Sequence, residues 1–290
     1  MANSPAHKFG QTIGYLLEEI VAMRLSDFCR SRCLYLDRQG YRAARKGKKI
    51  TFSDLFDNSH DLDFVIERDG TEHSCGEPVA FIEVAWRRYT KHSRNKVQEI
   101  QGAILPVAEK HRRSKPFVGA VLAGVFTEGA LAQLKSNGFS VLYFPYEKIT
   151  KAFLDMGLDI NFNEKTSDIE FAKANVFIES MLDFDRQKLI REFIEEARED
   201  INDFIRELSN VLDRQMKSIF IIPLHGKERF FDNIDDALEF LYSYDVNQSI
   251  QGEMLGYKVL VEFSNGDKID GEFYSKADVV SFIDFVASRR

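Results

Sequence analysis

The sequence is poor in the residues that define several protein classes. It contains three cysteines in 290 residues, too few for a framework of disulfide bonds. Cys29 and Cys33 stand four residues apart, but no second Cys or His pair completes a zinc site, so we expect free, reduced thiols. Glycine and proline number only 17 and 6, which excludes fibrous and low-complexity chains.

Long apolar runs and several enzyme motifs are also absent. No stretch of about 18 apolar residues occurs, so we expect no membrane-spanning helix. The N-terminal residues 1–12 lack the basic and then apolar pattern of a signal peptide, and we expect a cytoplasmic protein. A glycine-rich phosphate loop, Gly-x-Ser-x-Gly and His-Glu-x-x-His do not occur, and the six histidines show no ligand spacing.

What remains is an ordinary globular composition with an uneven charge. Hydrophobic residues make up 44% and charged residues 29%, which excludes wholesale disorder, and the length suggests two domains. The net charge is -7, yet residues 1–150 hold 22 Lys and Arg against 17 Asp and Glu, whereas residues 151–290 hold 17 against 29. The basic first half can therefore hold a polyanion, although the whole chain is acidic.

The basic residues of the first half gather in three runs, at 42–49, 87–96 and 110–115. One interpretation is that they are solvated faces and loops, and the other is that they contact nucleic-acid phosphates. As candidates for phosphate contacts we single out eight side chains in the first two runs: Arg45, Lys46, Lys48, Lys49, Arg87, Arg88, Lys91 and Arg94.

Hydrophobic periodicity predicts an α/β fold over residues 1–155. The expected elements are a helix at 11–34, strands at 64–66 and 79–86, a helix at 94–110, a strand at 117–126, a helix ending near 136, a strand at 139–144 and a helix at 146–154. The strand–helix–strand unit at 117–144 implies a parallel pair with a right-handed crossover. The first two strands lie close enough in sequence for a hairpin. We therefore expect a mixed sheet with helices on both sides.

The second half has a different character. From about residue 166 the pattern predicts long acidic helices, and apolar residues from Ile190 to Val211 alternate in steps of four and three, as in a heptad seam. Such a seam packs either within one chain or between two chains. Residues 218–290 predict a small α/β module, with strands at 219–223 and 259–263 and helices at 235–244 and 277–286. We therefore expect a core over 1–155, a helical linker or dimerisation region over 156–217 and a module over 218–290.

Two acidic residues stand on neighbouring predicted strands. Asp63 begins the first strand, and Glu83 interrupts the second, apolar one. A buried carboxylate needs a cation or a strong donor. Together with the Val84 carbonyl, the two acids offer the oxygen ligands that Mg²⁺ prefers, and a metal held there can activate water and stabilise charge on a phosphate. Glu18 of the first helix is a further candidate, the alternative being a surface acid.

In their order along the chain, these residues resemble the PD-(D/E)XK phosphodiesterase superfamily of restriction-endonuclease-like folds. The resemblance covers roughly residues 10–155 and rests on Gly14 and Glu18, Asp63, Glu83-Val84-Ala85, the basic helix from Ser93 to Glu99 and the elements that follow. It implies a mixed sheet flanked by helices, catalysis with Mg²⁺ or Mn²⁺, and double-stranded DNA as substrate. Because both strands must be cut, a homodimer is the economical arrangement.

The sequence departs from the family at one position. Two residues after the second acid the family has a lysine, which is thought to position or deprotonate the attacking water, and this chain has Ala85. Either Lys96, Lys91 or Arg87 supplies the cation, or the domain binds nucleic acid without cutting it. We favour Lys96, because a helix that directly follows the strand can aim a long side chain back at the strand end.

The sequence thus predicts a Mg²⁺-dependent endonuclease acting on double-stranded DNA. The resemblance implies a type II restriction enzyme or a related defence nuclease as its setting. Two alternatives stay open. One is a non-cutting nucleic-acid-binding protein, and the other is a structure-specific nuclease of DNA repair or recombination.

Overall fold

The computed structural model describes residues 4–90, 93–225, 239, 243 and 252–287. They fall into two compact units, residues 1–212 and residues 213–290, which we describe separately. In these described parts of the chain, no helix has both the length and the apolar character needed to cross a membrane.

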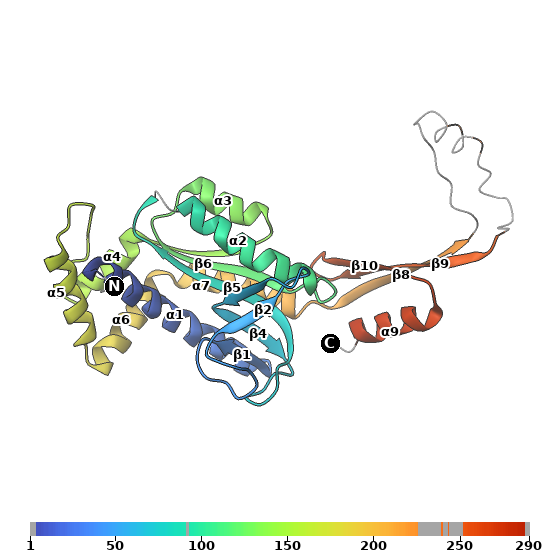
Figure 1. The fold of residues 1–290 in the computed structure, drawn as a ribbon, viewed down its shortest axis with the longest axis horizontal. Helices are drawn as coiled ribbons and strands as arrows, with labels where there is room; N and C mark the ends of the chain where they lie inside the picture. Colours follow the sequence, from blue (N-terminus) through green and yellow to red (C-terminus); the bar gives the residue numbers. More distant parts are fainter. Residues whose placement is uncertain (1–3, 91–92, 226–238, 240–242, 244–251, 288–290) are drawn as a thin grey trace. The chain divides into compact units, whose positions relative to one another are not determined.

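The first unit is built around a five-stranded mixed sheet with the order β1-β4-β5-β6-β7 (Figure 1). Its strands are β1 (Leu34–Arg38), β4 (Phe64–Arg68), β5 (Glu77–Arg87), β6 (Phe117–Gly124) and β7 (Ser140–Pro145). β1, β4 and β5 pair antiparallel, whereas β5, β6 and β7 run parallel. This arrangement confirms the predicted α/β class, its mixed sheet and its parallel strand–helix–strand unit.

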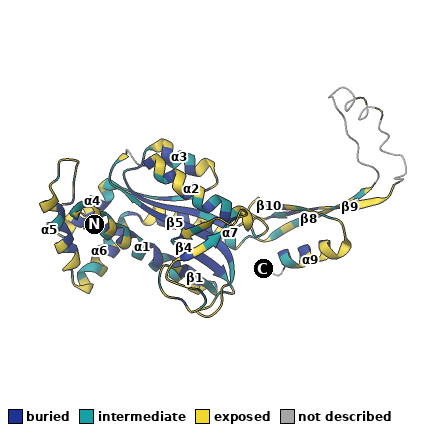
Figure 2. Ribbon diagram, in the orientation of Figure 1, coloured by how far each residue is buried: buried dark blue, intermediate teal, exposed yellow. Residues whose placement is uncertain are grey.

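Helices cover both faces of this sheet, so its strands are buried between two layers (Figure 2). One face carries α2 (Ser93–Lys110) and α3 (Glu128–Ser136), and the other carries α1 (Pro5–Ser31), α4 (Tyr146–Asp155) and α7 (Arg198–Leu212). Side chains alternate along β5, so that Ile82 and Val84 pack toward α1 while Phe81 and Ala85 pack toward α2. Glu83 therefore faces the α2 layer.

The acidic helices belong to the first unit. They are α5 (Asp168–Glu179), α6 (Asp183–Glu196) and α7, and the predicted seam is divided between α6 and α7 at Ala197. Its apolar residues are buried in the core beneath the sheet, where the Phe204 ring meets Phe117 edge-on at 5.4 Å. The unit thus extends to Leu212, beyond the boundary that we expected at residue 155. The apolar residues of the seam are buried or half-buried within this chain, and the homodimer stays a prediction.

The second unit is a small antiparallel sheet with one described helix. β8 (Met216–His225), β9 (Met254–Phe263) and β10 (Lys268–Phe273) have the order β10-β9-β8, and α9 (Lys276–Ala287) follows. Val259, Val261, Val279 and Phe282 form its core. The predicted strands at 219–223 and 259–263 and the helix at 277–286 are confirmed. The predicted helix at 235–244 lies outside the described residues.

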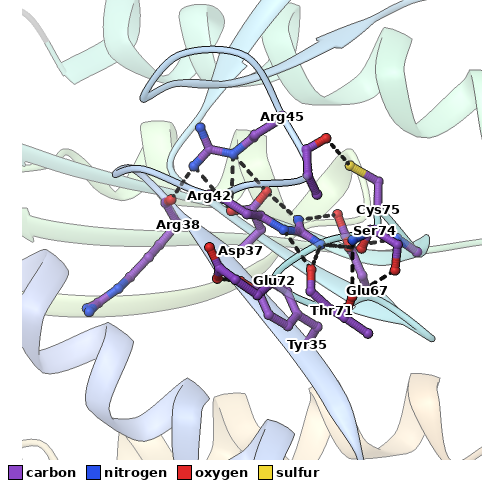
Figure 3. A network of polar contacts seen from close by, with 12 residues as sticks. Tyr35, Asp37, Arg38, Arg42, Arg45, Glu67, Thr71, Glu72, Ser74 and Cys75 are labelled. Carbon is purple, nitrogen blue, oxygen red and sulfur yellow. Dashed lines mark hydrogen bonds and ion pairs between the residues drawn. The ribbon is translucent and has the colours of Figure 1, made fainter.

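Three strands of the first unit were not predicted. β1 joins the edge of the main sheet, and β2 (Ile50–Ser53) pairs with β3 (Ser59–Leu62) in a separate antiparallel hairpin. The segment between β1 and β2 contains the basic run at 42–49. Arg42 and Arg45 anchor this segment on a buried network of charged groups (Figure 3), whereas Lys46, Lys48 and Lys49 are exposed.

The centre of this network is Arg42, whose side chain is 2% exposed. Its guanidinium donates hydrogen bonds to Asp37 at 2.7 Å and to both carboxylate oxygens of Glu67 at 2.7 and 3.0 Å. Arg45 approaches the same Asp37 at 3.2 Å and also donates to the carbonyls of Arg38 and Gly40. Two guanidinium groups thus balance two carboxylates, and each charge has a hydrogen-bonded partner. The expected phosphate contact of Arg45 is corrected accordingly, because its side chain holds the loop together.

We predict that Arg42→Met lowers the free energy of unfolding by about 3–5 kcal/mol, because it leaves buried carboxylates without their counter-charge. Urea denaturation monitored by circular dichroism measures the change. Lys46→Met, an exposed position in the same loop, serves as the control and should stay within about 0.5 kcal/mol of the wild type. Equal effects of the two substitutions would contradict a structural role for Arg42.

Candidate active site

Asp63 and Glu83 meet because β4 and β5 are antiparallel neighbours. Phe64 pairs with Ile82, so the residue before Phe64 lies beside the residue after Ile82. The Val84 N–H donates a hydrogen bond of 2.8 Å to the Asp63 carboxylate. The N–H and C=O of one strand residue point to the same side, so the Val84 carbonyl is directed toward Asp63 as well. The structure thus brings together the three predicted oxygen donors.

The Glu83 side chain is enclosed and incompletely paired. It is 12% exposed, and its Oε2 atom is buried without a hydrogen-bond partner. Buried polar atoms are nearly always hydrogen-bonded, since an unpaired one costs about 1–3 kcal/mol and more when it is charged. The orphaned oxygen therefore indicates a site that lacks a cation or a donor.

Lys96 of α2 supplies the nearest positive charge. Its Nζ atom lies 3.9 Å from Glu83 Oε1 and 3.6 Å from Glu99 Oε2. The start of α2 determines where Lys96 lies. There the buried Ser93 hydroxyl donates a hydrogen bond of 2.9 Å to the Thr90 carbonyl. Lys96 is thus in the first turn of the helix, and its side chain reaches back to β5.

Ala85 occupies the place of the family lysine and is part of the apolar core. It is 3% exposed and packs with Val97 and other residues beneath α2. A lysine there would have to extend along the strand face that carries Glu83 to keep its ammonium out of this core. The ammonium reaches Glu83 from the neighbouring helix instead.

The carboxyl groups of this site have pKa values above their ordinary range. Burial and the charge of Asp63 raise the pKa of Glu83 to about 8, although Lys96 opposes the shift. Burial also raises the pKa of Asp63, against the hydrogen bond from Val84 and the charge of Lys96. On α1, burial and the Asp63 charge raise the pKa of Glu18 to about 7, which places Glu18 in the same cluster. Shifted pKa values of this kind cluster at functional sites.

The predicted phosphate-contacting residues differ in their surroundings. Arg94 of α2, and Lys46 and Lys48 of the loop, are exposed. Lys49 pairs with Asp61 at 2.5 Å, and Lys91 lies outside the described residues.

Arg87 and Arg88 follow Glu83 at the end of β5. Arg87 donates to the Trp86 carbonyl at 2.8 Å and lies 3.8 Å from Glu99. The Arg88 guanidinium lies over the rings of Tyr89 and Phe171, at 4.4 and 4.3 Å.

The donors at this site fit a hard divalent cation. Asp63, Glu83 and the Val84 carbonyl offer only oxygen atoms, and the unpaired Glu83 Oε2 gives this set a reason to bind a cation. Within the described parts of the chain, no group of three or more His, Cys, Asp or Glu side chains forms a candidate metal site. Two carboxylates and one carbonyl are a smaller set, compatible with Mg²⁺ because this ion retains several waters.

The sequence analysis missed a cavity of about 420 Å³ that borders this cluster. Residues of α1 and the end of β5 line it, together with Lys96. One sequence pattern could have indicated it. Every fourth residue of the first helix is small and the next in this series is an acid, so they share one helix face: Ala6, Gly10, Gly14 and Glu18.

Comparisons with known proteins leave the site to be interpreted from its own residues. No protein-family model matches the chain, and no curated protein matches it. A solved structure described as "Crystal Structure of Protein of Unknown Function AF1548" aligns over 68% of this chain and 97% of that chain, at 15% identity and a TM-score of 0.31. A TM-score this low carries no argument about fold or function.

We predict that divalent cations stabilise the protein more at about pH 8 than at about pH 6. Below its raised pKa, Glu83 holds a proton in the folded chain that the unfolded chain, with a pKa of about 4.3, has released. The free energy of unfolding therefore falls as the pH rises from the unfolded pKa of about 4.3 to the folded pKa of about 8. A cation that binds the ionised carboxylates restores this lost stability. Melting temperatures with and without Mg²⁺ or Ca²⁺ measure the effect.

The variant Glu83→Gln separates this site from other cation sites. Without added metal it should unfold at a higher temperature than wild type at about pH 8, because no buried charge has to form, and it should lose most of the cation-induced shift. Glu128→Gln, an exposed position on α3, should behave like the wild type. A full cation shift in Glu83→Gln would place the bound metal elsewhere.

Proposed function

We propose that this protein is a Mg²⁺-dependent endonuclease that hydrolyses phosphodiester bonds of double-stranded DNA. One observation carries the proposal: Glu83 is buried with an unpaired oxygen, beside a second carboxylate and 3.9 Å from a lysine ammonium. Two acids and one lysine at a strand end are the groups that the PD-(D/E)XK resemblance requires, with Lys96 in place of the residue missing at Ala85.

The residues would divide the chemistry as follows. Asp63, Glu83 and the Val84 carbonyl would hold Mg²⁺, which when bound lowers the pKa of water and stabilises charge on the phosphate. The Lys96 ammonium, beside Glu83, would orient the attacking water and offset the developing negative charge. Glu18, with a pKa of about 7, can take up or release a proton near neutral pH. Mn²⁺, which accepts the same oxygen donors, should substitute for Mg²⁺.

The substrate part of the proposal rests on charge. Lys46, Lys48 and Arg94 are exposed in the first unit, and Arg87 is partly exposed near Glu83. Such groups neutralise phosphates of a duplex. A homodimer would present two sites, one for each strand. We include a restriction or related defence role in the proposal, and sequencing of the cut ends distinguishes it from a structure-specific repair or recombination nuclease.

A non-cutting DNA-binding protein is the second candidate, and Ala85 is the observation that favours it. Plasmid incubated with Mg²⁺ or Mn²⁺ separates the two functions. If the wild type leaves varied DNA substrates intact with either metal but retains them in a gel-shift assay, the binding function replaces the nuclease.

We predict that Asp63→Asn and Glu83→Gln abolish cleavage while leaving the fold and DNA binding intact, because each removes a charged metal ligand. Lys96→Ala should lower the chemical step by about 10²–10⁴-fold, the usual size of general acid–base or electrostatic assistance. Single-turnover cleavage at saturating enzyme measures these rates free of binding losses. Glu128→Gln and Lys135→Ala, exposed positions on α3, are the matched controls.

A lysine restored at the family position tests the role of Lys96 directly. Ala85→Lys in the Lys96→Ala background should recover part of the lost rate, because the new ammonium extends from the strand face that carries Glu83. If Lys96→Ala lowers the single-turnover cleavage rate no more than Lys135→Ala does, a catalytic role for Lys96 is contradicted.

We predict that DNA affinity falls steeply with salt and that the 42–49 loop contributes to the slope. Replacing Lys46 and Lys48 by Gln should reduce the slope of log affinity against log salt by about 0.9 for each phosphate contact that is lost. Fluorescence anisotropy of a labelled duplex, in Ca²⁺ to prevent cleavage, gives the slope. Lys135→Gln is the control, and an unchanged slope in the loop variant would place the loop away from DNA.

A further inference from the structure

The cavity beside the carboxylate cluster has the size of a small-molecule site. Its volume of about 420 Å³ lies within the range of about 300–1,000 Å³ that ligand pockets occupy. Val84, Ala85 and Lys96 form the end of the cavity next to Glu83. A molecule in this cavity therefore lies directly beside the proposed catalytic residues.

The cavity is cationic although the chain is acidic. Arg87, Arg88 and Lys96 line it, and none of the described residues that line it is Asp or Glu. The first turns of α1 also border the cavity and bring the positive end of a helix dipole to it. These features favour an anionic occupant.

Arg88 is the group best prepared to bind an anion. Its guanidinium lies over the Tyr89 ring and over the Phe171 ring, and these contacts do not use its hydrogen-bond donors. It has no hydrogen-bond or ion-pair partner among the described residues, and its Nε atom is buried. A planar guanidinium with free donors matches the oxygens of a phosphate.

The walls of the cavity offer aromatic surface and open space for a flat ring. Trp86 lines it from β5, and Tyr89 lines it from the segment that follows this strand. On α1, Ala6, Gly10 and Gly14 present almost no side chain, and a Cβ atom added at Gly14 would have no atom within 4 Å. Aromatic side chains next to a cationic group are the combination that binds an unstacked nucleic-acid base with its phosphate.

We propose that this cavity binds one nucleotide of the substrate strand, with its phosphate on Arg88 and its base against Trp86 and Tyr89. The inference rests on the proposed nuclease function for the identity of the strand. A base inside a duplex is not accessible to a cavity, so the nucleotide must be extruded from the helix or already unpaired. The substrate class is therefore DNA in which one nucleotide next to the cut leaves the stack.

Trp86 makes the proposal directly measurable, because it is the chain's single tryptophan. Thymidine 5′-monophosphate, titrated into the full-length protein in EDTA, should quench its fluorescence with saturation. Thymidine and inorganic phosphate, each offering half of the contacts, should bind at least tenfold more weakly. Absence of saturable quenching by the nucleotide would overturn the proposal. The measurement needs neither metal nor cleavage. If the protein cuts DNA but shows no quenching, the nucleotide proposal is contradicted and the nuclease function stands.

Two variants locate the binding. Gly14→Leu should fill the cavity and weaken nucleotide binding at least tenfold. Gly102→Leu, the same change at an exposed position of α2 with equally open space, should leave the affinity unchanged. Arg88→Gln should weaken the nucleotide about tenfold, which corresponds to about 1.4 kcal/mol, and leave thymidine unaffected. Equal affinities in the Gly14 and Gly102 variants would place the nucleotide outside the cavity and overturn the proposal.

Discussion

The candidate site depends on a difference in length between two paired strands. β5 spans Glu77–Arg87, whereas its antiparallel partner β4 begins only at Phe64, opposite Ile82. The last part of β5 is therefore hydrogen-bonded to β6 on one side and to no strand on the other. Backbone groups of β5 that would otherwise pair with β4 turn to Asp63, as the Val84 N–H does. The register of one strand pair thus leaves the last part of β5 without a partner strand on one side and places the Asp63 and Glu83 carboxylates there.

The same arrangement concentrates like charges where water is scarce. Burial raises the pKa of Asp63, and burial together with the Asp63 charge raises the pKa values of Glu83 and Glu18. The Lys96 ammonium offsets the shifts of Asp63 and Glu83 only in part. On the other side of β4, Arg42 and Arg45 neutralise Asp37 and Glu67 completely. The two buried carboxylates of the β1–β4 pair therefore have matching charges, whereas the carboxylates beside β5 are in excess of their one ammonium. The unmatched cluster is the one that has a reason to bind a cation.

The sequence predicted what depends on local pattern. Nearly continuous apolar runs located β5 and β6, and an acid inside one of these runs identified Glu83. It did not predict the Arg42 network, because Glu67 stands 25 residues after Arg42 and each of Asp37, Arg42 and Glu67 alone resembles a surface residue. The heptad spacing likewise did not show whether its apolar face meets a second chain or the chain's own sheet. The cavity beside Lys96 depends on how α1 lies across the end of β5, which periodicity does not determine.

The acidic helices α5, α6 and α7 lie on the α1 side of the sheet, whereas the helix that carries Arg94 and Lys96 lies on the other. The cationic groups that line the cavity are set between these layers, at the end of β5, and Arg88 lies over the Phe171 ring of α5 itself. A polyanion is repelled by the acidic helices and attracted by the cationic lining of the cavity. The acidic helices thus restrict where on the first unit an anionic partner can bind before any hydrogen bond forms.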